Sequence, residues 1–137
     1  MKKLIFILLT LAMATACNNS TNKKTAETTI VSDTTTVTVY YFHGKQRCKT
    51  CVAVGDVAKQ AVENYFADND KVRFVEINTS EKGNDTLIEK YEVTWNALII
   101  AKGENDIEIT DQAFATAVGN PQALENLVKE EVNKRLQ

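Results

Sequence analysis

The chain has 137 residues, of which 25% are charged, and its formal net charge is −2 at pH 7. This length fits one small domain, and the chain has no basic face and no block of like charges, which argues against nucleic acid as a partner. The chain has three cysteines, an odd number, so at least one of them is expected to serve a purpose other than an internal disulfide.

Residues 1–16 have the organisation of a lipoprotein signal peptide: a basic start, an apolar segment, and small residues directly before Cys17. The apolar segment is shorter than the roughly 20 residues that span a bilayer. We therefore expect lipid attachment at Cys17 and a periplasm-facing protein held on the bacterial envelope, with the outer membrane as the expected site. Ala14 stands where such motifs usually have Leu, and an ordinary signal peptide followed by a chance cysteine is the alternative.

Residues 17–35 are rich in Asn, Ser and Thr and show neither helical nor strand periodicity. This composition predicts a flexible tether between the lipid and a folded domain. The domain is expected to span residues 36–137.

The domain is predicted to begin with a strand that runs into a cysteine pair. Residues 36–42 are β-branched or aromatic, as in a strand buried on both faces, and a turn follows. The sequence Cys48-Lys49-Thr50-Cys51 then opens a segment with apolar residues at helical spacing through Tyr65. A strand followed by a vicinal cysteine pair at the start of a helix is typical of a thioredoxin-like redox centre.

The rest of the chain predicts three more strands, at residues 72–77, 97–101 and 107–109, a short helix at residues 85–92, a helical stretch from Asp111 and a last helix from Pro121. The helical crossover between the first two strands implies parallel pairing, and the turn at Gly103 implies an antiparallel hairpin. The resulting order, β-α-β-α-β-β-α, resembles the thioredoxin fold, an α/β fold with a central mixed sheet between helix layers.

Within the pair, Cys48 is expected to be the exposed nucleophile and Cys51 the resolving thiol. The free N–H groups and the positive end of the helix favour a thiolate at Cys48, and the nearby Lys45, Arg47 and Lys49 act in the same direction. Exchange would proceed through a mixed disulfide with a protein partner. A purely structural disulfide is the alternative.

Residues 40–51 (YYFHGKQRCKTC), together with the lipoprotein signal, resemble a family of small bacterial exported proteins named as the ArsF-type subunit of a nitrophenyl-compound nitroreductase. The resemblance implies electron delivery to a reductive enzyme system. The protein is expected to be a monomer. The residues themselves offer a dithiol and no flavin site, so no cofactor is expected.

Two features depart from thioredoxins. The proline that faces the cysteine pair in that family is replaced here by Asn96 or Ala97, since the only proline of the chain is Pro121. The carboxylate that thioredoxins bury beneath the cysteines is also absent from residues 40–42. Both departures predict weak activity toward a generic disulfide substrate such as insulin.

The remaining binding candidates each have two interpretations. Besides Lys49 and Thr50 inside the motif and Asn96 and Ala97 opposite it, Trp95 is either a substrate platform or a packing residue. A lone histidine at a strand end is usually solvated, but His43 could instead carry a proton or bind a metal.

Two other functions stay open at this point. The first is a soft-metal or metalloid site formed by Cys48 and Cys51, with His43 as a third ligand; structural zinc takes four ligands, and this chain offers at most three. The second is a non-catalytic, partner-binding subunit on a thioredoxin scaffold.

Overall fold

The computed structural model describes residues 34–137. The predicted signal peptide, Cys17 and nearly all of the predicted tether lie outside the described residues. The elements, in chain order, are β1 (Val37–His43), α1 (Lys49–Phe66), β2 (Val72–Asn78), α2 (Asp85–Lys90), β3 (Ala97–Lys102), β4 (Asn105–Glu108), α3 (Thr110–Thr116) and α4 (Pro121–Leu136).

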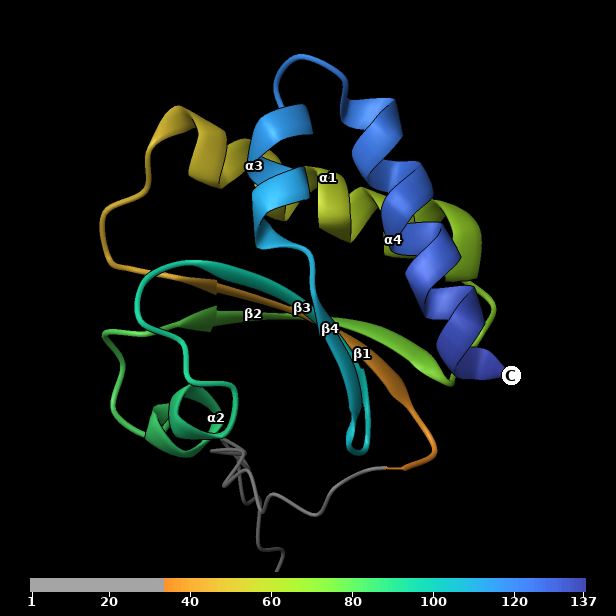
Figure 1. Ribbon diagram of the computed structural model, residues 1–137, viewed down its shortest axis with the longest axis horizontal. Coiled ribbons are helices and arrows are strands. Elements are labelled where there is room, and N and C mark those ends of the chain that lie inside the picture. Colours follow the sequence, from red (N-terminus) through yellow and green to blue (C-terminus); the bar gives the residue numbers. More distant parts are fainter. Residues whose placement is uncertain (1–33) are drawn as a thin grey trace, which may run out of the picture.

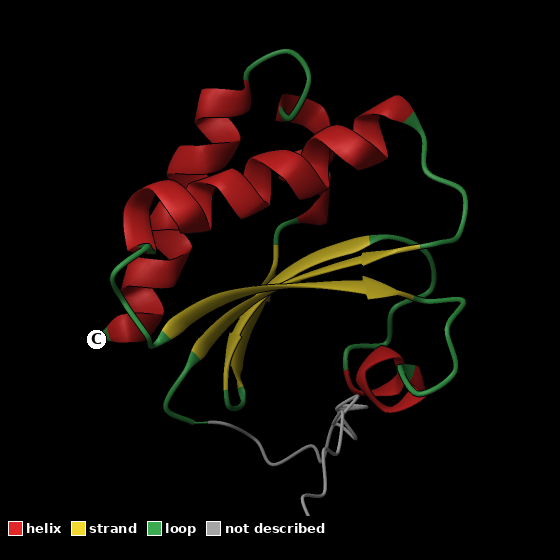
Figure 2. Cartoon of the chain, turned by 180° about the vertical axis from the view of Figure 1, so that it is seen from behind, coloured by secondary structure: helices red, strands yellow, loops and turns green. Residues whose placement is uncertain are grey.

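The four strands form one mixed sheet in the order β2-β1-β3-β4. Strand β1 pairs in parallel with β2 and antiparallel with β3, and β3 pairs antiparallel with β4. Helices α1, α3 and α4 cover one face of the sheet and α2 covers the other (Figures 1 and 2). This confirms the predicted thioredoxin-like α/β fold with its central mixed sheet.

The observed order counts one more helix than the predicted order, because the helical stretch predicted from Asp111 is a helix of its own, α3, ahead of the predicted last helix, α4. The side chain of Asn120 accepts a hydrogen bond from the backbone N–H of Ala123, and Pro121 occupies the first turn of α4. An asparagine cap followed by proline favours the start of a new helix over continuation of the previous one.

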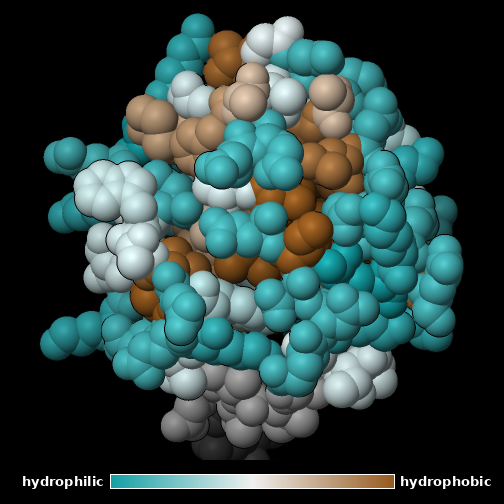
Figure 3. Space-filling model, in the orientation of Figure 1, coloured by the Kyte–Doolittle hydropathy of each residue, from teal (hydrophilic) through white to brown (hydrophobic). Residues whose placement is uncertain are grey.

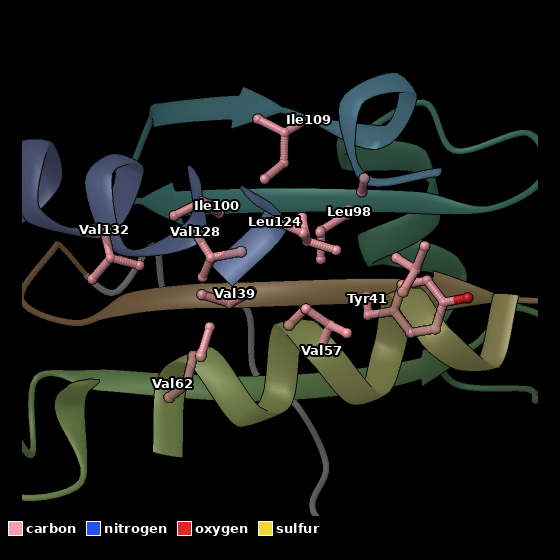
Figure 4. Close-up of a cluster of buried hydrophobic side chains, with 14 of the residues drawn as sticks. Val39, Tyr41, Val57, Val62, Leu98, Ile100, Ile109, Leu124, Val128 and Val132 are labelled. Atoms are coloured by element: carbon pink, nitrogen blue, oxygen red, sulfur yellow. The ribbon is translucent and has the colours of Figure 1, made fainter. Parts of the chain in front are cut away.

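The main hydrophobic core lies between the sheet and the helices on the α1 side (Figure 4). Strand β1 contributes Val39 and Tyr41, and helix α4 contributes Leu124, Val128 and Val132, all with 0% exposure. Full burial of a Val or Leu side chain contributes roughly 1.5–3 kcal/mol, so this cluster holds α1 and α4 against the sheet. Helix α1 accordingly buries Val54, Val57, Ala58 and Ala61, the residues recurring at helical spacing in the sequence.

A second, smaller core fixes the segment between α2 and β3. Phe42, Ile77, Ala97 and Ile99 are buried beneath the sheet, where apolar residues of α2 pack against them.

No helix within residues 34–137 is both long and apolar enough to cross a membrane. In the view of Figure 3 the surface is mainly hydrophilic, and hydrophobic residues show as interrupted patches.

Candidate functional site

The cysteine pair lies where β1 leads into α1. Cys48 and Cys51 form a disulfide with a Cα–Cα distance of 5.0 Å. Cys48 is the N-cap of α1, and its Sγ accepts a hydrogen bond from the backbone N–H of Cys51 at 3.1 Å. The first turn of α1 holds no acidic residue, so no carboxylate there offsets the positive end of the helix.

The two cysteines differ in access to solvent. Cys48 is exposed, whereas Cys51 is buried with 6% exposure. An incoming thiol or disulfide can therefore reach the first cysteine but not the second. This asymmetry matches the separate roles expected for a nucleophilic and a resolving cysteine.

Two side chains hold the backbone of Cys51 by hydrogen bonds to its carbonyl oxygen. The hydroxyl of Tyr41 donates a hydrogen bond of 2.6 Å to the carbonyl oxygen of Cys51, and Nη2 of Arg47 donates to the same oxygen at 3.5 Å. Burial raises the pKa of the Tyr41 phenol above its usual value, although Arg47 acts in the opposite direction. Tyr41 therefore stays protonated and remains a donor at neutral pH.

A carboxylate from the neighbouring strand completes this group. Nη1 of Arg47 lies 2.6 Å from Oε1 of Glu76, and Nε2 of His43 lies 3.3 Å from the same oxygen. The parallel register pairs Tyr41 with Glu76, which places both side chains on the α1 face of the sheet. We call Tyr41, His43, Arg47 and Glu76 the subsite cluster.

The subsite cluster changes the expected charge distribution around Cys48. The positive charge of Arg47 is compensated by Glu76, whose side chain is 44% exposed. Within residues 34–137, Lys45 and Lys49 are exposed and form no ion pair. The uncompensated cations near Cys48 are therefore these two lysines.

Gly55 allows α1 to lie close to the subsite cluster. A Cβ atom at this position would lie 2.7 Å from Nη2 of Arg47 and 2.8 Å from the ring of Tyr41. The guanidinium of Arg47 also lies over the Tyr41 ring, 5.4 Å from its centroid. A larger side chain at this position would clash with Tyr41 and Arg47, which explains why a glycine stands inside this helix.

A pocket of about 350 Å³ borders the loop that leads from β1 to Cys48, and neither cysteine is among its lining residues. Three loops line it: the β1–α1 loop, the β2–α2 loop and the α2–β3 loop, which gather at one end of the sheet (Figure 1). Trp95 is 80% exposed, so it is not a packing residue. We call this cavity the Trp95 pocket; its lining residues are Gly44, Lys45, Gln46, Thr79, Ser80, Thr94, Trp95 and Asn96.

The predicted site residues thus separate into groups. Lys49 and Thr50 lie in the first turn of α1 with the cysteines, and Trp95 and Asn96 line the pocket. Ala97 is buried in the second core with 3% exposure.

Both ring nitrogens of His43 are near oxygens, since Nδ1 lies 2.8 Å from the carbonyl oxygen of Gly44 and Nε2 is near Glu76. Among residues 34–137, no three His, Cys, Asp or Glu side chains are grouped as a metal site would require.

Sequence reasoning missed Glu76, the contacts of Tyr41, and the role of Gly55. Glu76 was detectable in principle, because it is a charged residue on the same face as Val72 and Phe74 in a strand predicted to pair with β1. The expectation that residues 40–42 lack a carboxylate agrees with the sequence of β1. The neighbouring strand carries Glu76, but its side chain is 44% exposed and pairs with Arg47.

The fold and the disulfide together define a thioredoxin-like protein with a CxxC cysteine pair, an arrangement that fits a redox role. No protein-family model and no curated protein matches this chain. A solved structure described as "Structure of a malarial protein" is similar, with a TM-score of 0.50 and 18% sequence identity over 74% of this chain and 99% of that chain. At this identity the likeness concerns the fold alone.

Proposed function

We propose that this domain is a thiol–disulfide oxidoreductase or redox carrier that works through the Cys48–Cys51 pair. One observation carries the proposal: the disulfide sits at the N-terminus of α1 with Cys48 exposed and Cys51 buried. A purely structural disulfide has no need of this asymmetry or of a helix terminus that stabilises a thiolate.

In the reducing direction, the Cys48 thiolate attacks one sulfur of a partner disulfide. The partner's other sulfur leaves as a thiolate, and a mixed disulfide joins the partner to Cys48. The Cys51 thiolate then attacks Sγ of Cys48, which releases the second partner sulfur and restores the protein disulfide. The N–H of Cys51, already 3.1 Å from Sγ of Cys48, stabilises the thiolate at the start of this cycle.

The test is trapping of the intermediate. Cys51→Ala should accumulate mixed disulfides at Cys48, because the resolving thiol is gone, whereas Cys48→Ala should accumulate none. In the reduced wild type, the Cys48 thiol should titrate below about 7.5, under the usual value of about 8.5. Equal alkylation rates of the two thiols at neutral pH would show that the roles are wrongly assigned.

The setting we propose for this chemistry is the bacterial envelope, with lipid attached at Cys17 and electrons passed to a reductive enzyme system. The support lies in the signal-like residues 1–16 and in the family resemblance of residues 40–51. Cys17→Ser should move the protein from the membrane fraction to the soluble fraction. Unchanged fractionation would contradict lipid attachment.

A further inference from the structure

We propose that the Trp95 pocket binds a small thiol, or the corresponding disulfide, that carries a carboxylate, and presents its sulfur to Cys48. This inference rests on the proposed function and adds the substrate class to it. A low-molecular-weight anionic thiol would thus be an electron donor or acceptor of the Cys48–Cys51 pair.

The pocket is already formed by contacts within the chain. The backbone N–H and the hydroxyl of Thr79 both donate to the carbonyl oxygen of His43, at 2.9 and 3.2 Å. The N–H of Ser80 donates to Oδ1 of Asn78 at 3.0 Å. The two bonds from Thr79 tie the β2–α2 loop to the end of β1, and the bond from Ser80 holds the start of the loop on β2, so the wall needs no ligand to order it. The volume of about 350 Å³ falls in the range of small-molecule sites, roughly 300–1,000 Å³.

The lining offers donors and a cation but no carboxylate. Lys45 is its one charged residue, whereas the whole chain has a net charge of −2. Within residues 34–137, the side chains of Lys45, Gln46, Ser80, Thr94 and Asn96 hydrogen-bond to no other residue. They are available to a ligand, and the sign of the local charge selects an anion.

Trp95 supplies the apolar surface of the site. Its side chain is 80% exposed in a loop that the second core holds in place. An exposed indole loses contact with water when a planar or apolar group stacks on it, which favours binding of such a group. A ligand with an apolar body and an acidic end therefore matches both Trp95 and Lys45.

A small ligand fits this surface better than a protein partner does. A stable protein interface buries about 800 Å² on each side and has an apolar centre. In the described part of the chain, only Val52, Trp95 and Val118 are large exposed hydrophobic residues. Three such residues provide little apolar surface for a stable protein interface, but Trp95 suffices for one small molecule.

The reaction with such a thiol balances without another reactant. The ligand thiolate attacks Sγ of Cys48, the bond from Cys48 to Cys51 breaks, and the Cys51 thiolate takes a proton. A second thiolate then attacks the ligand sulfur of the mixed disulfide and displaces Cys48 as a thiolate. Two thiols become one small disulfide, and two electrons pass to the protein pair.

Binding can be measured separately from redox chemistry, because Trp95 is the only tryptophan of the chain. In the oxidised wild type, the intrinsic fluorescence should respond to 4-(methylthio)benzoate, an unreactive anion, at about threefold lower concentration than to the neutral 4-(methylthio)benzamide. Lys45→Gln should abolish this preference. The matched control, Lys71→Gln, changes an exposed lysine at the far end of β2 and should retain it.

Exchange is measured with the reactive pair, 4-mercaptobenzoate and 4-mercaptobenzamide. Each thiol reduces the Cys48–Cys51 disulfide at a measurable rate, and the ratio compared is the rate with the benzoate divided by the rate with the benzamide. This ratio should be about threefold lower in Lys45→Gln than in the wild type and unchanged in Lys71→Gln. A fluorescence signal without charge preference, or no signal, overturns the pocket proposal even where Cys51→Ala still traps mixed disulfides. Binding with full preference but no exchange at Cys48 overturns delivery of the ligand sulfur to Cys48. The proposed function is overturned only where Cys51→Ala also traps no mixed disulfide.

Discussion

Nη1 of Arg47 lies 2.6 Å from Oε1 of Glu76 on the neighbouring strand, 29 residues further along the chain. Arg47 directly precedes Cys48, so this ion pair ties the residue before Cys48 to strand β2. It also cancels a positive charge that would otherwise stabilise the Cys48 thiolate. The ion pair therefore affects both the position and the electrostatics of the cysteine pair.

Removing the carboxylate should make the protein a stronger oxidant. In Glu76→Gln, Arg47 keeps its charge without compensation, so the pKa of the Cys48 thiol should fall. A stabilised thiolate favours the reduced form and raises the reduction potential. The pH dependence of alkylation and equilibration with a glutathione buffer measure the two quantities.

The converse variant, Arg47→Gln, should raise the pKa of the Cys48 thiol, because it leaves the negative charge of Glu76 alone. The double variant should lie between the two single variants. Shifts of the same sign in both single variants would mean that the pair acts through loop structure and not through charge.

The fold was predictable from local patterns. The alternation of strands and helices, the crossover after β1 and the turn at Gly103 are each encoded within a few neighbouring residues, and the sheet confirms the pairing they imply. The cysteine pair at the start of α1 was predictable for the same reason.

The surroundings of the cysteines were not predictable in this way. The contact between Arg47 and Glu76 depends on the exact register of β1 and β2 and on the path of the loop after His43. Sequence spacing left Trp95 with two equal interpretations, and only its exposure decides between them. The position of Ala97 in the sequence, directly after Trp95 and Asn96, likewise did not reveal that its side chain is buried in the second core.

Gly55→Ala should destabilise the domain, although alanine is the better helix former by about 1 kcal/mol. The added methyl would lie 2.8 Å from the buried ring of Tyr41, and overpacking of this kind costs roughly 1–3 kcal/mol. We expect a net loss of about 1 kcal/mol in urea unfolding. Gly119→Ala is the control, since nothing lies within 4 Å of a Cβ there; an equal loss in both variants would contradict the steric cause.

The buried carboxylate of Glu131 should make stability depend on acid pH. Its Oε1 accepts from Lys134 at 2.7 Å and its Oε2 from Arg135 at 2.8 Å, while Nε of Arg135 donates to the carbonyl oxygen of Asn105. The hydrogen bond from Lys134 is the largest cause that lowers the pKa of Glu131 from its ordinary value of 4.5, with Arg135 acting in the same direction.

A lowered carboxyl pKa means that this stabilisation is complete above pH 4.5 and is lost as the pH falls through the folded-state value. Glu131→Gln should cost roughly 1–3 kcal/mol at pH 7, because it leaves Arg135 buried without its charge partner. The penalty should shrink below pH 4. The control is Glu130→Gln, which changes an exposed partner of Lys134 and should cost less than about 1 kcal/mol. A penalty for Glu131→Gln that is constant with pH would contradict the idea that ionisation of Glu131 causes the pH dependence.

The segment that carries Trp95 begins at a strained residue, and relieving that strain should stabilise the domain. Glu92 has φ of 51°, and the bonds from Glu92 N–H to Glu89 and from Val93 N–H to Ile88 close the end of α2 in a Schellman motif. Glycine adopts this left-handed conformation without the cost of about 1–2 kcal/mol that a Cβ imposes, although it loses more entropy on folding. Glu92→Gly should therefore raise the free energy of unfolding by about 0.5–1 kcal/mol.

Glu92→Ala keeps the Cβ and should show no gain, which separates backbone strain from loss of the carboxylate. An equal gain in both variants would point to charge, since Glu92 lines a second pocket together with Glu104, Asp106 and Glu108.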